Sequence, residues 1–133
     1  MSSILLNKSD FNLESANILQ KQSKYCSVVH CAYYSSIQLM KYILLYKANK
    51  TDAIIIQERD VSGEGSHEYM ISTVSKFLRE KKHPEVVTFL KGINDLKKMR
   101  VKADYEEIQI DDTIGRNSIL LSEQSNKILK KYI

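Results

Sequence analysis

The chain has 133 residues, of which 43% are hydrophobic and 27% charged, a balance typical of one globular domain. Its net charge of +4 permits a polyanionic partner, but the basic residues stand singly or in pairs, which excludes a basic tail that binds nucleic acid. No stretch approaches the ~20 apolar residues of a membrane span, and no signal peptide is evident. We therefore expect a cytoplasmic protein without a membrane segment.

The first two predicted helices lie in the N-terminal third of the chain. Ser9 is the expected N-cap of a helix over about residues 10–22, which carries a narrow apolar stripe. The second helix, over about residues 25–47, has an apolar face wide enough to contact two neighbours, as the centre of a helical bundle requires. Tyr33 and Tyr34 point roughly 100° apart on this helix, so at least one of them should lie near the surface.

Residues 48–65 form the one long connection expected in the chain. A connection of this length is uncommon in a compact helical domain and is often functional or mobile. It contains three consecutive isoleucines at residues 54–56, followed by polar residues and two glycines. The isoleucines fit a helical extension, a short strand or a docking patch, and all three interpretations stay open.

The C-terminal half of the chain predicts three further helices. The first of these lies over about residues 66–82 and has Ser66 as its expected N-cap. The second lies over about residues 84–103 and begins with Pro84. An extended stretch over residues 104–112 then precedes the last helix, and few Gly and Pro residues interrupt the pattern. The whole pattern predicts a single all-α domain over residues 1–133. The candidate N-caps of the last helix are Asp111, Asp112 and Thr113.

The cysteines and histidines do not form a recognisable metal-binding motif. Cys26 and Cys31 are five residues apart on one predicted helix, so they point apart and a mutual disulfide is not expected. No Cys/His set has zinc-finger spacing. We expect His30, beside the apolar stripe of the second helix, to be structural and His83 to be a helix-end residue. The sequence thus predicts neither a metal nor a cofactor.

An arginine continues the apolar face of the fourth predicted helix. Arg100 lies four residues after Leu96 and seven after Ile93, which belong to that face. An arginine is rarely buried unless a partner meets it, and Asp104 and Tyr105 follow where the helical pattern stops. Two interpretations are open: Arg100 pairs with Asp104 and extends its charged end to solvent, or it is a cation in a groove that binds an anion.

Three short motifs, in this order, resemble those of the HEPN family. They are Ala-Tyr-Tyr-Ser at residues 32–35 in the second predicted helix, Ser66-His67 at the start of the third, and MRVKADY at residues 99–105. Each motif is weak alone, but their order and spacing are similar to those of small stand-alone prokaryotic HEPN proteins over nearly the whole chain. The resemblance implies an antiparallel up-and-down bundle of four to five helices that pairs as a homodimer.

The resemblance also implies a biological setting and a site. HEPN proteins of this size often act beside a minimal nucleotidyltransferase in toxin–antitoxin or defence modules, and many members are metal-independent ribonucleases. Catalytic candidates in this chain, if it cleaves RNA, are Arg100, Tyr105 and His67. The expected nucleotide- or RNA-binding residues are Arg100, Asp104, Tyr105, His67, Tyr33 and Tyr34.

The ribonuclease motif of that family is incomplete in this chain. Ribonuclease members carry a histidine shortly after the arginine, but residues 105–107 are Tyr, Glu and Glu. Histidine suits removal of the 2′-hydroxyl proton because its pKa is ~6.5, whereas tyrosine with a pKa of ~10 is a poor base. We therefore expect a weakly catalytic or non-catalytic protein that binds RNA or nucleotide and acts with a nucleotidyltransferase. The alternatives are a metal-independent endoribonuclease and a purely structural or interaction dimer.

The apolar surface also predicts an assembly. The second helix is apolar over more than one face, which a small bundle alone would leave partly exposed, so we expect a two-fold dimer. Such a dimer would bring two Arg100 side chains to one cleft. Two like charges in one groove repel each other unless an anion lies between them, so phosphate, nucleotide or RNA should stabilise the dimer.

Overall fold

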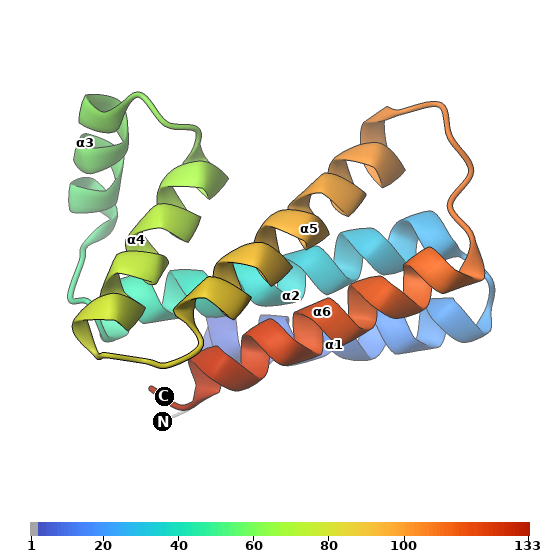
Figure 1. Ribbon diagram of the computed structural model, residues 1–133, viewed down its shortest axis with the longest axis horizontal. Coiled ribbons are helices and arrows are strands. Elements are labelled where there is room, and N and C mark those ends of the chain that lie inside the picture. Colours follow the sequence, from blue (N-terminus) through green and yellow to red (C-terminus); the bar gives the residue numbers. More distant parts are fainter. Residues whose placement is uncertain (1–2) are drawn as a thin grey trace.

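The computed structural model describes residues 3–133, and every regular element in this part of the chain is a helix (Figure 1). The all-α prediction is therefore confirmed. Among these residues, no helix combines the length and the apolar character that crossing a bilayer requires. The six helices are α1 (Ile4–Lys21), α2 (Tyr25–Tyr46), α3 (Asp52–Ser62), α4 (Ser66–Glu80), α5 (Val86–Tyr105) and α6 (Asp112–Lys130).

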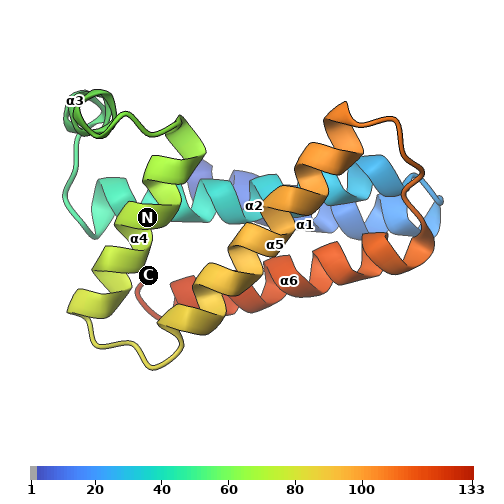
Figure 2. The ribbon, with the colours of Figure 1, turned by 45° about the horizontal axis from the view of Figure 1, so that its top comes forward.

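Helix α2 is the centre of the fold. It contacts α1, α4, α5 and α6, and α1 and α6 run alongside it while α5 runs obliquely across it (Figures 1 and 2). The residues of its wide apolar face are buried within the chain, among them Val28, Tyr33 and Met40 at 0% exposure. The wide apolar face of this helix is thus confirmed. Contrary to our expectation, it needs no second subunit to cover it, because four helices of the same chain already do so.

A cluster of buried polar side chains joins α1, α2 and α6. Asn126 donates from Nδ2 to the Ser35 hydroxyl at 3.0 Å and accepts from the Ser36 hydroxyl at 2.8 Å. The hydroxyls of Ser35 and Ser9 each donate to the backbone carbonyl of the other at 2.7 Å. The Ser122 hydroxyl lies 3.1 Å from that of Ser36. None of the five residues is more than 3% exposed, so these hydrogen bonds offset the cost of burying their polar groups.

Helix α1 begins earlier than the sequence predicts. Its N-cap is Ser3, whose hydroxyl accepts from the backbone N–H of Leu5 at 3.1 Å, and not Ser9. Ser9 lies inside the helix and faces α2, where its small side chain permits the close contact with Ser35. A serine before an apolar stripe is a cap signal only at a helix end, and here the helix extends one and a half turns further.

The long connection over residues 48–65 contains a helix of its own, which gives six helices rather than four to five. Thr51 caps α3 by accepting from the backbone N–H of Ile54 at 3.2 Å, and Gly63 ends the helix with a φ of +73°. The three isoleucines therefore belong to a separate helix, and the strand interpretation is wrong. No residue of α3 is buried, and Ile56 is 51% exposed.

The remaining boundaries lie close to their predicted positions. The N-cap of α4 is Gly65 rather than Ser66, which is the first helical residue. Helix α5 begins at Val86 rather than at Pro84, which lies in the turn that precedes the helix. Of the three candidate N-caps of α6, the structure selects Asp111, whose carboxylate accepts from the backbone N–H of Ile114 at 2.9 Å.

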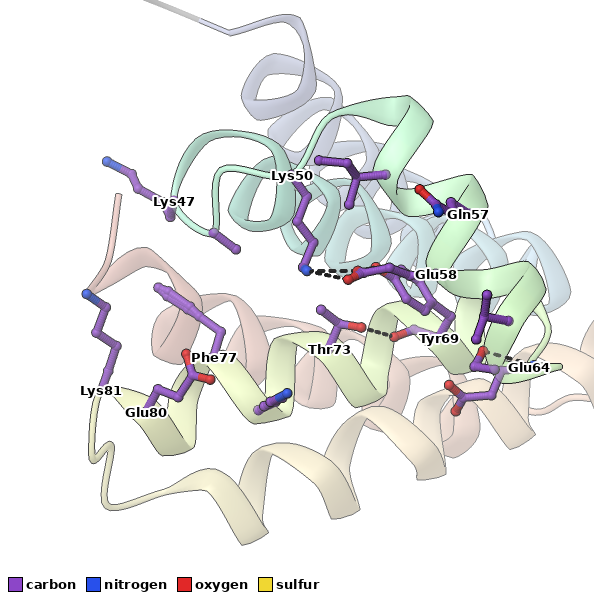
Figure 3. A pocket seen from close by; sticks show the side chains of 15 residues that line it. Lys47, Lys50, Gln57, Glu58, Glu64, Tyr69, Thr73, Phe77, Glu80 and Lys81 are labelled. Atoms are coloured by element: carbon purple, nitrogen blue, oxygen red, sulfur yellow. Dashed lines mark hydrogen bonds and ion pairs between the residues drawn. The ribbon is translucent and has the colours of Figure 1, made fainter.

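A groove of about 780 Å³ separates α3 from α4, and a charged contact spans it (Figure 3). The Glu58 carboxylate on α3 accepts from Lys50 Nζ at 2.8 Å and from the Tyr69 hydroxyl of α4 at 2.6 Å. These two hydrogen bonds hold the pKa of Glu58 below its usual range. Burial and the Glu58 carboxylate raise the pKa of Tyr69 to about 12, so the phenol stays a donor. Glu58 thus ties a helix without buried residues to the rest of the fold.

Replacing Glu58 with glutamine is expected to loosen α3. The amide keeps the shape of the side chain but loses the charge that both donors meet. A partly exposed ion pair contributes at most ~1 kcal/mol, so the backbone amides of α3 should exchange no more than about fivefold faster, with those of α4 unchanged. Hydrogen exchange measured by mass spectrometry tests this, with Asp60→Asn on the same helix as the control. Equal exchange in both variants would show that Glu58 does not hold α3 against the rest of the fold.

Candidate functional site around Arg100

Arg100 lies near the end of α5 on the apolar face that the sequence predicts. Ile93 and Leu96 on that face are fully buried, and Arg100 itself is only 8% exposed. Its Nε atom is buried without a hydrogen-bond partner in the described part of the chain. A buried guanidinium with an open donor is unusual, because charged groups are normally buried only with partners. This side chain is therefore the starting point of the site.

Three tyrosines surround the Arg100 guanidinium. Its central carbon lies 5.0 Å from the ring centre of Tyr33, 5.5 Å from that of Tyr105 and 5.9 Å from that of Tyr34. These distances are those of cation–π contacts, which stabilise a cation without using its N–H donors. One terminal nitrogen also lies 3.4 Å from the Tyr105 hydroxyl, a long hydrogen bond. The guanidinium is thus held mainly by ring faces, and its Nε makes no hydrogen bond within residues 3–133.

Asp104 is shared between Arg100 and a histidine. Its Oδ2 lies 3.7 Å from a terminal nitrogen of Arg100 but only 2.9 Å from Nδ1 of His30 on α2. The pairing of Arg100 with Asp104 is therefore confirmed. Arg100 does not extend its charged end to solvent, however, since its side chain is only 10% exposed. The neighbouring rings, not the carboxylate, provide most of its cover.

His30 is the site residue that sequence reasoning missed. We expected a structural histidine, but its side chain is 50% exposed, bonds to Asp104 and stacks 4.7 Å from the ring centre of Tyr34. One signal was present: His30 precedes Tyr34 by four residues on the same helix, so the two share a face. Its contact with Asp104 spans 74 residues of sequence, and no local pattern predicts it.

His67 joins the same cluster from the first turn of α4. Its Nδ1 lies 2.8 Å from the Tyr33 hydroxyl, and its ring centre lies 5.4 Å from Tyr33 and 5.7 Å from Tyr34. Burial lowers the pKa of His67, and the positive charges of Arg100 and Lys97 lower it further. These effects favour the neutral form of His67. Burial also raises the pKa of Tyr33 to about 12, so its phenol stays protonated.

The structure brings together all six binding residues that the sequence predicts, and it adds His30. The seven side chains come from the middle of α2, the beginning of α4 and the final turns of α5. In Figure 1 the latter two segments diverge from each other beside α2. The groove in Figure 3 is lined by none of these residues. The site thus combines one buried cation, one shared carboxylate, two histidines and three tyrosines.

The two cysteines and the remaining histidine do not belong to this cluster. Cys26 and Cys31 are both free thiols, so the expectation of no disulfide is confirmed. His83 is buried, and its Nδ1 lies 2.7 Å from the hydroxyl of Tyr132, which ties the C-terminal end to the turn before α5. Among residues 3–133, no group of three or more His, Cys, Asp or Glu side chains has an arrangement that could hold a metal ion.

Comparisons with models of protein families, with curated proteins and with solved structures found no match for this chain. The resemblance to HEPN proteins therefore stays a prediction from the three sequence motifs. All three motifs contribute side chains to the one cluster: Tyr33 and Tyr34 from the first, His67 from the second, and Arg100, Asp104 and Tyr105 from the third.

Acidification is expected to destabilise the wild-type protein more than a His67→Gln variant. The folded pKa of His67 lies below the ordinary ~6.5, so the unfolded chain takes up the proton first. The stability linked to neutral His67 is thus fully present above pH ~6.5 and is lost as the pH falls towards the folded pKa. Thermal unfolding at pH 7.5 and pH 5 measures this for both proteins. Equal losses of melting temperature would show that His67 does not carry this dependence.

Proposed function

We propose that the protein is a HEPN-like homodimer that binds RNA or nucleotide at the Arg100 cluster. We further propose that it acts with a nucleotidyltransferase partner in a toxin–antitoxin or defence module. The MRVKADY motif and the two other motifs support the family, and the chemistry of the cluster supports an anionic ligand. A nucleotidyltransferase gene next to the gene of this protein would support the partner.

The buried Arg100 guanidinium with an unpartnered Nε carries the proposal. An oxygen of a phosphate group would accept from the terminal nitrogens, as arginine commonly does with phosphate, and would reach the enclosed Nε only if the surrounding rings moved apart. The ligand would replace a 3.7 Å contact with Asp104, and Asp104 would keep its 2.9 Å bond to His30. Asp104 would therefore keep a hydrogen-bonded neighbour while the ligand pairs with Arg100, which limits the cost of separating the two.

Binding of a fluorescently labelled RNA oligonucleotide, followed by anisotropy, tests the proposal. Wild-type protein should bind, Arg100→Ala should not, and Lys98→Ala should behave like the wild type. Lys98 is a suitable control because it is an exposed cation on the same helix, two residues away. Equal loss in both variants would indicate a general attraction between charges rather than a site.

The position of His67 supports a second candidate function, a metal-independent endoribonuclease. We expected weak catalysis because no histidine follows Arg100 in the sequence, but α4 supplies a neutral histidine to the cluster. A neutral imidazole can accept the 2′-hydroxyl proton, and a guanidinium can stabilise the phosphorane that follows. Cleavage of labelled RNA that persists in EDTA, and that disappears in both Arg100→Ala and His67→Gln, would establish this activity. Intact RNA after long incubation would exclude it.

The surface beside Arg100 supports the dimer. Val101 and Ile108 are exposed there by 36% and 47%. A two-fold contact across this side would cover apolar surface and place two Arg100 side chains in one cleft. Light scattering at tens of micromolar is expected to give twice the chain mass of 15.4 kDa, and added polyphosphate should raise the melting temperature. A mass near 15.4 kDa would refute the dimer.

A further inference from the structure

We infer that Tyr105 is a stacking platform for an unpaired base, so the site recognises single-stranded RNA rather than phosphate alone or duplex. The inference rests on the proposed function, because it adds a base to the phosphate that Arg100 would hold. The expected ligand is an unpaired base next to its own phosphate. A free nucleotide and a single strand share this chemistry, and the ligand that we expect is the single strand.

Exposure distinguishes Tyr105 from the other two tyrosines at the guanidinium. Tyr33 is fully buried, and its hydroxyl shares a hydrogen bond with His67. Tyr34 is half-buried between the rings of His30 and His67. Tyr105 is the last residue of α5 and is 74% exposed. Among the described residues, its only hydrogen bond is the 3.4 Å approach to Arg100. Of the three rings, only this one offers a large free surface to a ligand.

The position of the ring next to Arg100 fits a nucleotide. The guanidinium lies 5.5 Å from the ring centre of Tyr105, so a base stacked on the ring has a phosphate of the same strand beside the cation. Stacking of bases on aromatic side chains, next to cations that follow the backbone, is how proteins bind single strands without reading their sequence. A base inside an A-form duplex is stacked on its neighbours and cannot leave to meet the ring at low cost.

The charges around the ring set the direction of the strand. Glu106 and Glu107 follow Tyr105 directly, and both are exposed, so they repel phosphate on that side. Lys97 lies three residues before Arg100 on α5, whereas the two glutamates follow the end of that helix. The strand would therefore run from Tyr105 past Arg100 towards the beginning of α4. This path also brings the sugar that follows the stacked base towards His67.

Tyr105→Trp provides a direct probe, since the chain contains no other tryptophan. Titration with oligouridylate or oligoadenylate should quench the fluorescence of this tryptophan, because a stacked base does so. Inorganic polyphosphate should occupy Arg100 and compete with the oligonucleotide without quenching. A duplex of the same length, and uridine or adenosine monophosphate at equal concentration, should quench far less. Equal quenching by the mononucleotide would assign the site to free nucleotides and overturn the strand.

Affinity measurements on two further variants complete the test. Tyr105→Phe should bind the oligonucleotide like the wild type, and Tyr105→Ala about 5- to 100-fold more weakly, the range for one stacked base. Tyr105 is exposed, so neither change threatens the fold. Binding that Arg100→Ala abolishes but Tyr105→Ala leaves unchanged would overturn the platform and keep the proposed function. Absence of any RNA binding by the wild type would overturn both.

Discussion

Replacing Arg100 with methionine is expected to weaken RNA binding about 10- to 100-fold while leaving the melting temperature near that of the wild type. The loss of affinity follows from the hydrogen bonds between a charged donor and phosphate, which contribute ~1.5–3 kcal/mol. Stability should hold because an apolar side chain of similar length fills the space between the three tyrosine rings. Removing only one partner of a buried ion pair usually destabilises a protein, so this expectation depends on what Asp104 keeps as a partner.

The structure gives a further reason to expect a stable Arg100→Met protein. Asp104, which loses its cation, keeps the closer bond to His30, and its side chain is 20% exposed and so partly hydrated. Anisotropy titrations and thermal unfolding of the same preparations measure both effects. RNA binding retained by Arg100→Met would contradict the site and favour a purely structural role. A large fall in melting temperature would show that the arginine mainly holds the helices together.

Arg100→Lys separates charge from shape at the same position. Lysine keeps the positive charge but lacks the flat guanidinium that lies against three rings and offers a fork of donors. We expect this variant to bind RNA between the wild type and Arg100→Met. Its comparison with the methionine variant measures how much of the affinity depends on charge alone.

The helices that pack on the core are the part of the fold that the sequence predicts well. The periodic apolar residues of α2 and α5 indicated both helices and placed Arg100 on the buried face of α5. Helix α3 was missed because it buries no residue, so its isoleucines lack the pattern that packing imposes. Three residues of one kind in a row have no period, and they fit a strand as well as a helix.

The site was predicted to the extent that its residues lie in the three motifs. Tyr33, His67 and Arg100 come from separate motifs, and their meeting depends on how three helices cross. Only the resemblance to HEPN proteins predicted that residues of the three motifs would come together. His30 belongs to none of them, and its role follows from the turn of α2 that faces Asp104. Contacts between distant side chains of this kind appear only when the helices are packed.

The same limit applies to the buried polar cluster, since nothing in the sequence marks Asn126 on α6 as the partner of Ser35 and Ser36. In the folded chain its amide joins α6 to α2, and through Ser35 and Ser9 it supports the contact of α2 with α1. The cluster holds the three helices in one register, because a shift of any helix would separate donors from acceptors that water cannot reach.

Replacing Asn126 with alanine is therefore expected to destabilise the protein by ~2–3 kcal/mol, although alanine is the better helix former. Two buried hydrogen bonds and the volume of the amide are lost together, and this should lower the melting temperature by about 8–12 °C. Asn117→Ala is the matched control, because Asn117 is exposed on the same helix and its replacement should change stability by no more than ~0.5 kcal/mol. Calorimetry of both variants measures the difference. Equal, small shifts would mean that the serines re-pair with one another, as the 3.1 Å approach of Ser36 to Ser122 allows.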